Sequence, residues 1–270
     1  MKKLIVNADD FGYSEEINKG IIESHLNGIV TSTSMIVNMP GFKSAVKSAK
    51  KHPSLDIGIH LNLTEGKPLL NSLLAVKGKF SGSYLNFILN KYPEEEIEVE
   101  LEAQITKLKS AGIKISHIDG HQHIHVFPNV FKIIINLAKK HNIKYIRIPD
   151  EKRVSVLDKV FSASIYDGQL IKNIALSVLS LNKKRILKEN GLKTTDNFYG
   201  VLSANQLTFT KMASVLKQVE EGLSELICHP GNENYDNYLN RIREKKILTH
   251  ENIKQLIKDQ NIKLTNFKSL

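Results

Sequence analysis

The sequence contains no tryptophan, a single cysteine and no long apolar run. The lone cysteine, Cys228, excludes an internal disulfide and fits a reducing compartment. No stretch approaches the roughly 18 consecutive apolar residues that a membrane-spanning helix needs. The N-terminal segment turns acidic at Asp9, without the apolar core of a signal peptide. We therefore expect a cytoplasmic protein that does not enter a membrane.

Several catalytic motifs are also missing. No P-loop, Gly-x-Gly-x-x-Gly turn or Gly-x-Ser-x-Gly elbow follows an expected strand, so nucleotide-cofactor chemistry is not expected. Cys228 stands beside His229, but neighbours in sequence rarely form a nucleophile–base pair. A cysteine at the end of a strand is usually buried rather than reactive.

The composition is that of an ordinary globular protein, with 270 residues, 41% hydrophobic and 24% charged. The net charge of +10 suggests a nucleic-acid partner as one alternative. The lysines are dispersed over the polar sides of helical segments, however, and many are mixed with glutamates. We therefore expect a solvated basic surface and no nucleic-acid partner, with a weak preference for an anionic or polar substrate.

Strand-like apolar runs alternate with helical patterns along the whole chain. The expected strands cover residues 3–8, 32–37, 56–64, 113–119, 143–149, 198–202, 222–228 and 262–267. Helices are expected near 14–28, 41–51, 93–112, 128–141, 210–221 and 249–260, with 150–190 mostly helical. No change in composition marks a linker. The pattern predicts one α/β domain over 1–270, a (β/α) barrel of about seven parallel strands, with a doubly wound open sheet as the alternative.

Polar side chains of catalytic types collect where the expected strands end. They are Asp9 and Asp10 after the first strand, His60 in the third, His121, His123 and His125 after the fourth, Arg147 at the end of the fifth, and His229 after 222–228. The carboxyl ends of parallel strands converge on one face of a barrel. The sequence therefore predicts that these residues share one pocket.

The adjacent pair Asp9 and Asp10 suits a divalent cation, provided that the chain turns away there and both carboxylates reach one site. One carboxylate and two imidazoles can bind the ion, and the second carboxylate can then take a proton from water. The alternative is that the pair only caps the helix that begins near Ser14.

The histidines leave alternatives open. His60 fits either a ligand or a hydrogen-bonded core histidine, and His117 is expected deeper in its strand as a structural residue. Three ligands to one ion from the run 121–125 would strain the geometry. One or two of these histidines are therefore expected to orient the others or to contact substrate.

Five segments together resemble the YdjC-like carbohydrate deacetylases, the group that includes the chitooligosaccharide and hopanoid-biosynthesis deacetylases. They are Ile5-Val-Asn-Ala-Asp-Asp-Phe-Gly12, Gly28-Ile-Val-Thr-Ser-Thr33, Ile57-Gly-Ile-His-Leu61, His117-Ile-Asp-Gly-His-Gln-His-Ile-His-Val-Phe-Pro128 and Cys228-His-Pro-Gly231. The resemblance runs from residue 4 to the last strand and is weakest over 150–195.

This resemblance implies a single distorted (β/α) barrel related to polysaccharide deacetylases and one divalent metal ion, with magnesium slightly favoured over zinc. It implies hydrolysis of the N-acetyl group of an amino sugar or short oligosaccharide. The implied roles are Asp9 as general base, Asp10, His60 and His121 as metal ligands, His229 as general acid or substrate contact, and Arg147 as support for the base or the sugar. His123 and His125 are then expected to be supporting or substrate-facing residues, with His125 as the candidate substrate contact. The family often has Asp-Ser-His-His-His where this chain has Asp-Gly-His-Gln-His, which leaves His121 as the best ligand in that run.

Three rival functions remain open at this level. The first is a metal-dependent hydrolase of another amide or of a phosphoester, since Asp/His sites on barrels serve both. The second is a basic nucleic-acid-binding protein, and the third is a sugar-binding protein without catalysis. The segment 65–92 and the region 150–200 are expected to select the substrate. A homodimer is compatible with the sequence.

Overall fold

The structure is a computed structural model that describes residues 1–71, 73–82, 86, 92–151, 169–202, 204, 207–234 and 240–270. Its helices are α1 (Glu15–Leu26), α2 (Phe42–Lys51), α4 (Glu94–Ser110), α5 (Pro128–His141), α7 (Gln169–Ser180), α8 (Lys183–Glu189), α9 (Phe209–Gln218), α10 (Arg241–Leu248) and α11 (Glu251–Asp259), with short 3-10 helices η1 (His121–Val126) and η2 (Phe267–Ser269). Its strands are β1 (Lys2–Phe11), β2 (Ser32–Met35), β3 (Asp56–Leu61), β4 (Ala75–Val76), β5 (Lys79–Phe80), β6 (His117–Gly120), β7 (Tyr145–Ile146), β8 (Asn197–Tyr199), β9 (Gly222–Cys228) and β10 (Ile262–Leu264).

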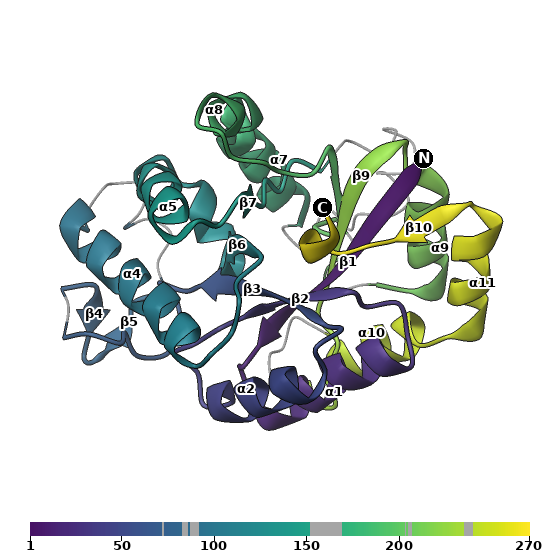
Figure 1. The fold of residues 1–270 in the computed structure, drawn as a ribbon, viewed down its shortest axis with the longest axis horizontal. Helices are drawn as coiled ribbons and strands as arrows, with labels where there is room; N and C mark the ends of the chain where they lie inside the picture. Colours follow the sequence, from purple (N-terminus) through teal and green to yellow (C-terminus); the bar gives the residue numbers. More distant parts are fainter. Residues whose placement is uncertain are drawn as a thin grey trace.

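Seven parallel strands form one curled sheet in the order β7-β6-β3-β2-β1-β9-β8 (Figure 1). Two isolated parallel bridges lie at the edges of this sheet. One joins Tyr145 on β7 to Lys193, and the other joins Glu151 to Phe198 on β8. The eighth strand, β10, pairs with the first residues of β1, and β9 pairs with β1 from Lys2 to Ala8. The predicted barrel-like α/β fold of about seven parallel strands is confirmed.

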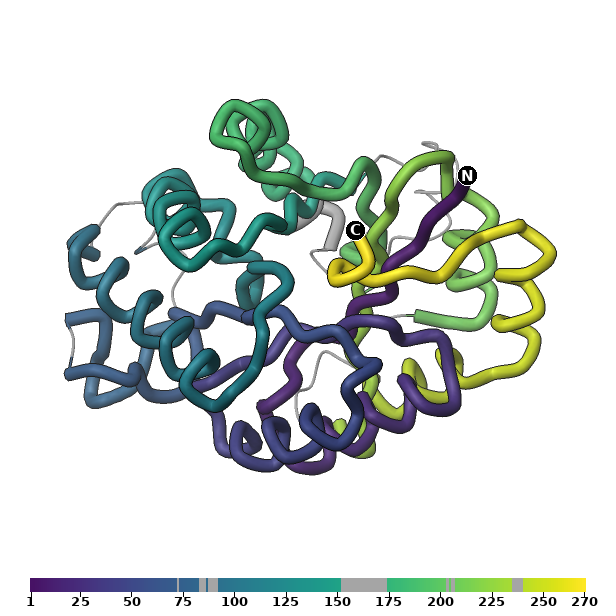
Figure 2. Tube along the Cα trace, viewed as in Figure 1, coloured from purple at the N-terminus to yellow at the C-terminus, as the bar shows by residue number. Residues whose placement is uncertain are grey.

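Helices surround the curled sheet, with α1 and α2 on one side, α4 and α5 on the next, and α9 and α11 near the C-terminal strands (Figures 1 and 2). The side chains of the first strand show why helices cover the sheet. Its side chains Leu4, Val6 and Ala8 are fully buried in the main apolar core that the helices cover. The strand can be apolar toward the helices because a parallel sheet is buried on both faces.

The opposite face of β1 points into the barrel. At the bottom, Ile5 packs with Tyr145 and Phe267 in a small apolar cluster. Above it lies a polar layer, in which Asn7 donates to Ser34 and Ser34 donates to Asp119, 2.8 Å and 2.5 Å apart. The residues that build the site therefore occupy alternate, inward positions of neighbouring strands.

His117 belongs to this buried layer, as predicted for a structural histidine. Its Nε2 lies 3.1 Å from Ser34 Oγ, and its ring stacks on Phe267 with centroids 4.1 Å apart. Gly58 on β3 leaves room for the ring, because a Cβ at that position would come within 2.3 Å of it. Burial, only partly opposed by Asp119, lowers the pKa of His117 to about 4, so the ring is neutral.

The structure corrects several predicted boundaries. The first strand continues through both aspartates to Phe11, whereas β6 and β7 are shorter than the apolar alternation suggested. The polar segment after Gly231 contains α10, and the segment 65–92 contains the antiparallel pair β4–β5. The helical prediction for 150–190 is confirmed for α7 and α8, and residues 152–168 lie outside the described part.

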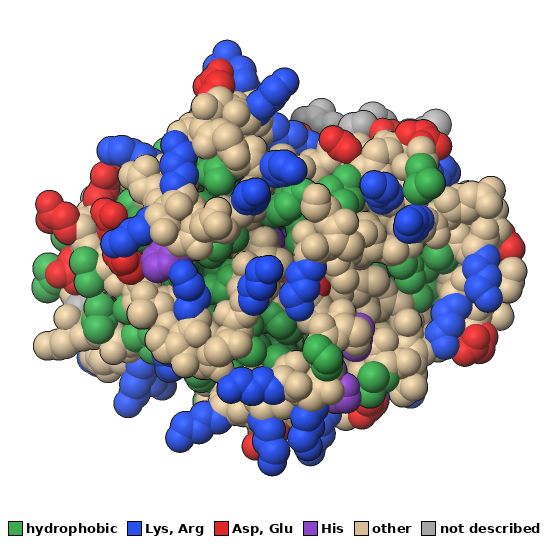
Figure 3. Space-filling view, in the orientation of Figure 1, with side chains coloured by type: hydrophobic (Ala, Val, Ile, Leu, Met, Phe, Trp, Pro, Cys, Tyr) green, Lys and Arg blue, Asp and Glu red, His purple; other side chains and the backbone are tan. Residues whose placement is uncertain are grey.

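The surface of the face shown in Figure 3 carries Lys and Arg side chains spread widely, with Asp and Glu among them. They do not gather into a single stripe on that face. No helix in the described ranges is both long and apolar enough to cross a membrane.

Candidate functional site

Asp9 and Asp10 reach the same side-chain cluster because the end of β1 is irregular. The register between β1 and β2 shifts between Ala8 and Phe11, and Asp10 has a positive φ of 72°. A β-bulge of this kind re-aims side chains that a regular strand would send to opposite faces. Ser14, not the aspartates, caps α1 by accepting a hydrogen bond from the Ile17 amide, so the capping alternative is wrong.

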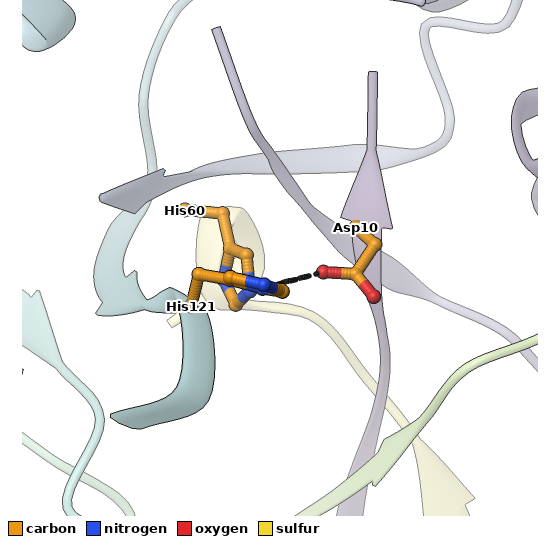
Figure 4. Close-up of side chains that lie close together, drawn as sticks. All are labelled: Asp10, His60 and His121. Carbon is orange, nitrogen blue, oxygen red and sulfur yellow. Dashed lines mark hydrogen bonds and ion pairs between the residues drawn. The ribbon is translucent and has the colours of Figure 1, made fainter. Parts of the chain in front are cut away.

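Asp10, His60 and His121 converge at the carboxyl ends of β1, β3 and β6 (Figure 4). Asp10 Oδ1 lies 3.0 Å from His121 Nδ1 and 3.4 Å from His60 Nε2. The exposed fraction is 2% for Asp10 and His60 and 8% for His121. The three residues predicted as metal ligands therefore form one buried group, and their role stays a proposal.

Asp119 orients His60 from behind. The two residues are register partners on β3 and β6, and His60 Nδ1 lies 2.7 Å from Asp119 Oδ1. Burial alone would lower the pKa of His60, but the charge of Asp119 and hydrogen bonds to Asp10 and Asp119 raise it to about 10. The carboxylates around His60 thus favour positive charge strongly.

Asp9 lies in a different environment, in which it is hydrogen-bonded to Arg147. Arg147 donates to both carboxylate oxygens of Asp9 at 2.7 Å and 2.8 Å, and Asn7 Nδ2 adds a third hydrogen bond at 2.8 Å. The same guanidinium contacts Asp119 at 2.7 Å and Glu225 at 2.8 Å. Burial raises the pKa of Glu225 to about 7, although Arg147 opposes this.

A divalent cation fits the Asp10 group. Ligand atoms around an ion with bonds of about 2.1 Å stand roughly 3.0–3.5 Å apart, which matches the two Asp10 distances. One carboxylate and two imidazoles also form a common donor set for such an ion. A second grouping, Asp9 with His60 and Asp119, has comparable spacing but contains the Arg147 guanidinium, which already supplies its positive charge.

The other predicted residues lie close by in different settings. His125 is fully buried and bonds through Nε2 to the Arg147 carbonyl oxygen at 3.0 Å. Arg147 is 1% exposed. Contact of these two residues with substrate stays a prediction, and their burial favours the alternative in which Arg147 holds Asp9.

His229 follows the last residue of β9, whose Cys228 is the register partner of Ala8 on β1. It therefore stands next to Asp9 along the strand ends and is partly exposed. Its loop packs closely on α1, because a Cβ at Gly20 would come within 2.4 Å of the Gly231 backbone. The catalytic role of His229 stays a prediction.

Three charged residues of the cluster escaped the sequence analysis. Arg241, the first residue of α10, donates to Asp10 Oδ2 at 2.7 Å. Glu225, on β9, accepts a hydrogen bond from Arg147. Glu65 lies 3.3 Å from His121 Nε2. Only Glu65 left a signal, because Asn62-Leu-Thr-Glu65 is typical of a side-chain-stabilised turn, although the strand was expected to continue to residue 64 and ends at Leu61.

The chain is similar to known proteins over nearly its whole length. A family model described as YdjC-like protein matches residues 3–259. The chain is 35% identical to a carbohydrate deacetylase of Brevibacillus brevis over 99% of both chains, and 34% identical to one of Thermoanaerobacter pseudethanolicus over all of both. A solved Enterococcus faecalis structure, provisionally described as a cellobiose-phosphate cleavage protein, is similar with a TM-score of 0.80 and 29% identity, covering 99% of this chain and 98% of that chain.

Proposed function

Because the chain belongs to the YdjC-like family, we propose that it is a metal-dependent hydrolase that removes the N-acetyl group from an acetylated amino sugar or short oligosaccharide. The observation that carries the proposal is the buried convergence of Asp10, His60 and His121 in a chain whose full-length relatives are named carbohydrate deacetylases. Acetate and a free amine would be the products.

Asp10, His60 and His121 would hold one divalent cation. The ion would supply Lewis-acid polarisation of the amide carbonyl and ease the deprotonation of water. The family resemblance favours magnesium slightly, whereas two imidazole donors suit zinc. Metal analysis of the purified protein therefore belongs to the test.

Asp9 would act as the general base. It lies beside the proposed metal ligands without being one of them, and Arg147 and Asn7 fix its orientation. It would accept a proton from the water that attacks the carbonyl carbon. His229, on the neighbouring strand end, would deliver a proton to the nitrogen as the carbon–nitrogen bond breaks.

Acetate release tests the proposal directly. The metal-loaded protein is incubated with N-acetylglucosamine and its short oligomers, and acetate and free amine are measured before and after chelation. We expect equal amounts of both products, lost with the chelator and restored by metal. Absence of acetate from every acetylated sugar, with metal bound stoichiometrically, would refute the deacetylase.

A phosphorylated disaccharide is the competing substrate, because the similar Enterococcus faecalis structure carries the description of a cellobiose-phosphate cleavage protein. The same preparation is therefore assayed for release of a sugar phosphate and for inorganic phosphate. Formation of either product without acetate would favour that chemistry over deacetylation.

A further inference from the structure

His121 lies between two carboxylates. Its Nδ1 is 3.0 Å from Asp10 Oδ1, and its Nε2 is 3.3 Å from Glu65 Oε1. Glu65 comes from the segment after β3 and is 34% exposed at its side chain, so it stands at the rim of the buried group. The two nitrogens of one ring therefore face an inner and an outer acid.

Glu65 is held firmly in this place. Tyr13 donates to Glu65 Oε2 at 2.7 Å, and Gln122 donates to Oε1 at 3.0 Å. The buried side chain of Asn62 accepts from the Glu65 amide at 3.0 Å and donates to its carbonyl oxygen at 2.8 Å. Tyr13 and Gln122 thus fix the carboxylate beside the outer nitrogen of His121, and Asn62 fixes the backbone that carries it.

His60 shows the same arrangement with its nitrogens exchanged. Its Nδ1 lies 2.7 Å from Asp119, and its Nε2 faces Asp10 at 3.4 Å. Both rings direct an edge at the Asp10 carboxylate (Figure 4). They do so with opposite ring nitrogens.

We propose that Glu65 is a positioning residue that holds His121 so that Nδ1 binds the cation, whereas His60, held by Asp119, binds through Nε2. A neutral imidazole has one N–H donor and one lone pair, and an ionised carboxylate only accepts. Each ring faces a carboxylate through both nitrogens, so a cation at Asp10 takes the lone pair of the nearer nitrogen. The hydrogen then lies on the other nitrogen, beside Glu65 for His121 and beside Asp119 for His60. The inference rests on the proposed function only in that a divalent cation occupies the site.

Replacing each histidine in turn with asparagine and with glutamine tests which ring nitrogen binds the cation. The polar end of asparagine approximates the position of Nδ1, and that of glutamine approximates Nε2. Dissociation constants for Zn²⁺ and Co²⁺ are measured by calorimetry on chelator-stripped His60→Asn, His60→Gln, His121→Asn and His121→Gln. We expect H60Q to bind about tenfold tighter than H60N, and H121N about tenfold tighter than H121Q. Equal binding within the His121 pair, or the reverse order, would overturn the assignment.

Glu65→Gln tests the positioning role without removing either imidazole. We expect its Kd for Zn²⁺ to rise about tenfold, the lower end of such effects, because the neutral amide keeps an oxygen beside Nε2 but loses the charge of the carboxylate. Glu98→Gln is the matched control, because it removes the same charge from an exposed position on α4 and should leave the Kd unchanged. Equal Kd values for Glu65→Gln and the wild type would refute the role of Glu65.

The two proposals fail in different ways. A wild-type protein that binds no divalent cation would contradict the metal-dependent function, and the nitrogen assignment with it. A wild type that binds metal and releases acetate, together with an unaffected Glu65→Gln, would contradict only the positioning role. Circular dichroism melts identify any histidine variant that fails to fold, and the Glu65 and Glu98 pair then decides.

Discussion

Asp9 and Asp10 are neighbours in sequence, yet their surroundings differ in one decisive respect. Arg147 occupies both carboxylate oxygens of Asp9, whereas Arg241 contacts Oδ2 of Asp10 and leaves Oδ1 facing two imidazoles. Burial alone would raise the pKa of Asp10, but Arg241 and His121 hold it well below its ordinary value. Asp10 therefore keeps one carboxylate oxygen for a further cation beside Arg241, whereas both oxygens of Asp9 are already bonded to Arg147.

This difference supports the proposed roles, in which the Asp10 group is the metal side and the Asp9 group is the base side. The two groups meet at His60 and Asp119. The division explains how two adjacent carboxylates can perform different tasks in one pocket. Both sides lie over the same polar layer inside the barrel, so the layer supports them equally. Four experiments test whether the two aspartates differ in this way.

Replacing each aspartate with asparagine should give the largest effects. Asp9→Asn should lower kcat for acetate release by about 10²–10⁴-fold while leaving metal bound, because only proton transfer is lost. Asp10→Asn should lose the metal, and activity with it. Metal content by atomic spectroscopy, alongside kcat, distinguishes the two variants. Loss of metal in Asp9→Asn would show that the two sides are not separate.

Arg147→Met should destabilise the fold by about 3–5 kcal/mol, because three buried carboxylates would lose their shared cation. Urea unfolding of the metal-free protein measures this change. Arg185→Met is the control, since Arg185 is exposed and pairs only with exposed Glu189 among its described contacts. Its expected cost is below about 1 kcal/mol. Similar costs for both variants would mean that Arg147 is not essential to the base side.

The pKa of the buried His117 predicts that the fold loses stability in acid. Its pKa is about 4 when folded, against an ordinary value of 6.5, so the unfolded chain binds the proton more readily. This contribution to stability is present above pH 6.5 and is lost as the pH falls toward 4, by an amount of the order of 3 kcal/mol. Unfolding free energies of the wild type and His117→Gln between pH 7 and 4 should differ in slope by one proton. Parallel curves would contradict the assignment.

Metal affinity should rise with pH, by about tenfold per unit for each proton displaced. In the metal-free protein the pKa of His60 is about 10, so the ring is protonated at neutral pH and must lose its proton to bind the ion. Calorimetry in buffers of different ionisation enthalpy counts the protons released between pH 6.5 and 8.5. A pH-independent affinity would show that the imidazoles are not ligands.

The strand-end positions were accessible from sequence because alternation and parallel topology place Asp9, His60 and His121 at one end of the barrel. The family resemblance then assigned roles to these residues. The bulge that turns Asp10 was not predictable, since it depends on pairing with β2 and not on a local motif. Arg241 also gave no signal, because a cation in a polar helical segment resembles any surface residue until the fold brings it to Asp10.

Glu225 illustrates the same limit within a regular strand. Its position in β9 was predicted correctly, but its inward direction and its contact with Arg147 follow from the register between β9 and β1. Sequence patterns specify which residues alternate. They do not specify which charged residues neutralise one another across the barrel.

The pairing of β1 has a consequence for the order of folding during synthesis. This strand is made well before two of its neighbours, β9 and β10, which begin at Gly222 and Ile262. Such contacts are distant in sequence and form slowly. Asp9 and Arg147 can therefore emerge from the ribosome long before Glu225 joins them. We expect the nascent chain to keep its charged interior open to water until its last strands arrive.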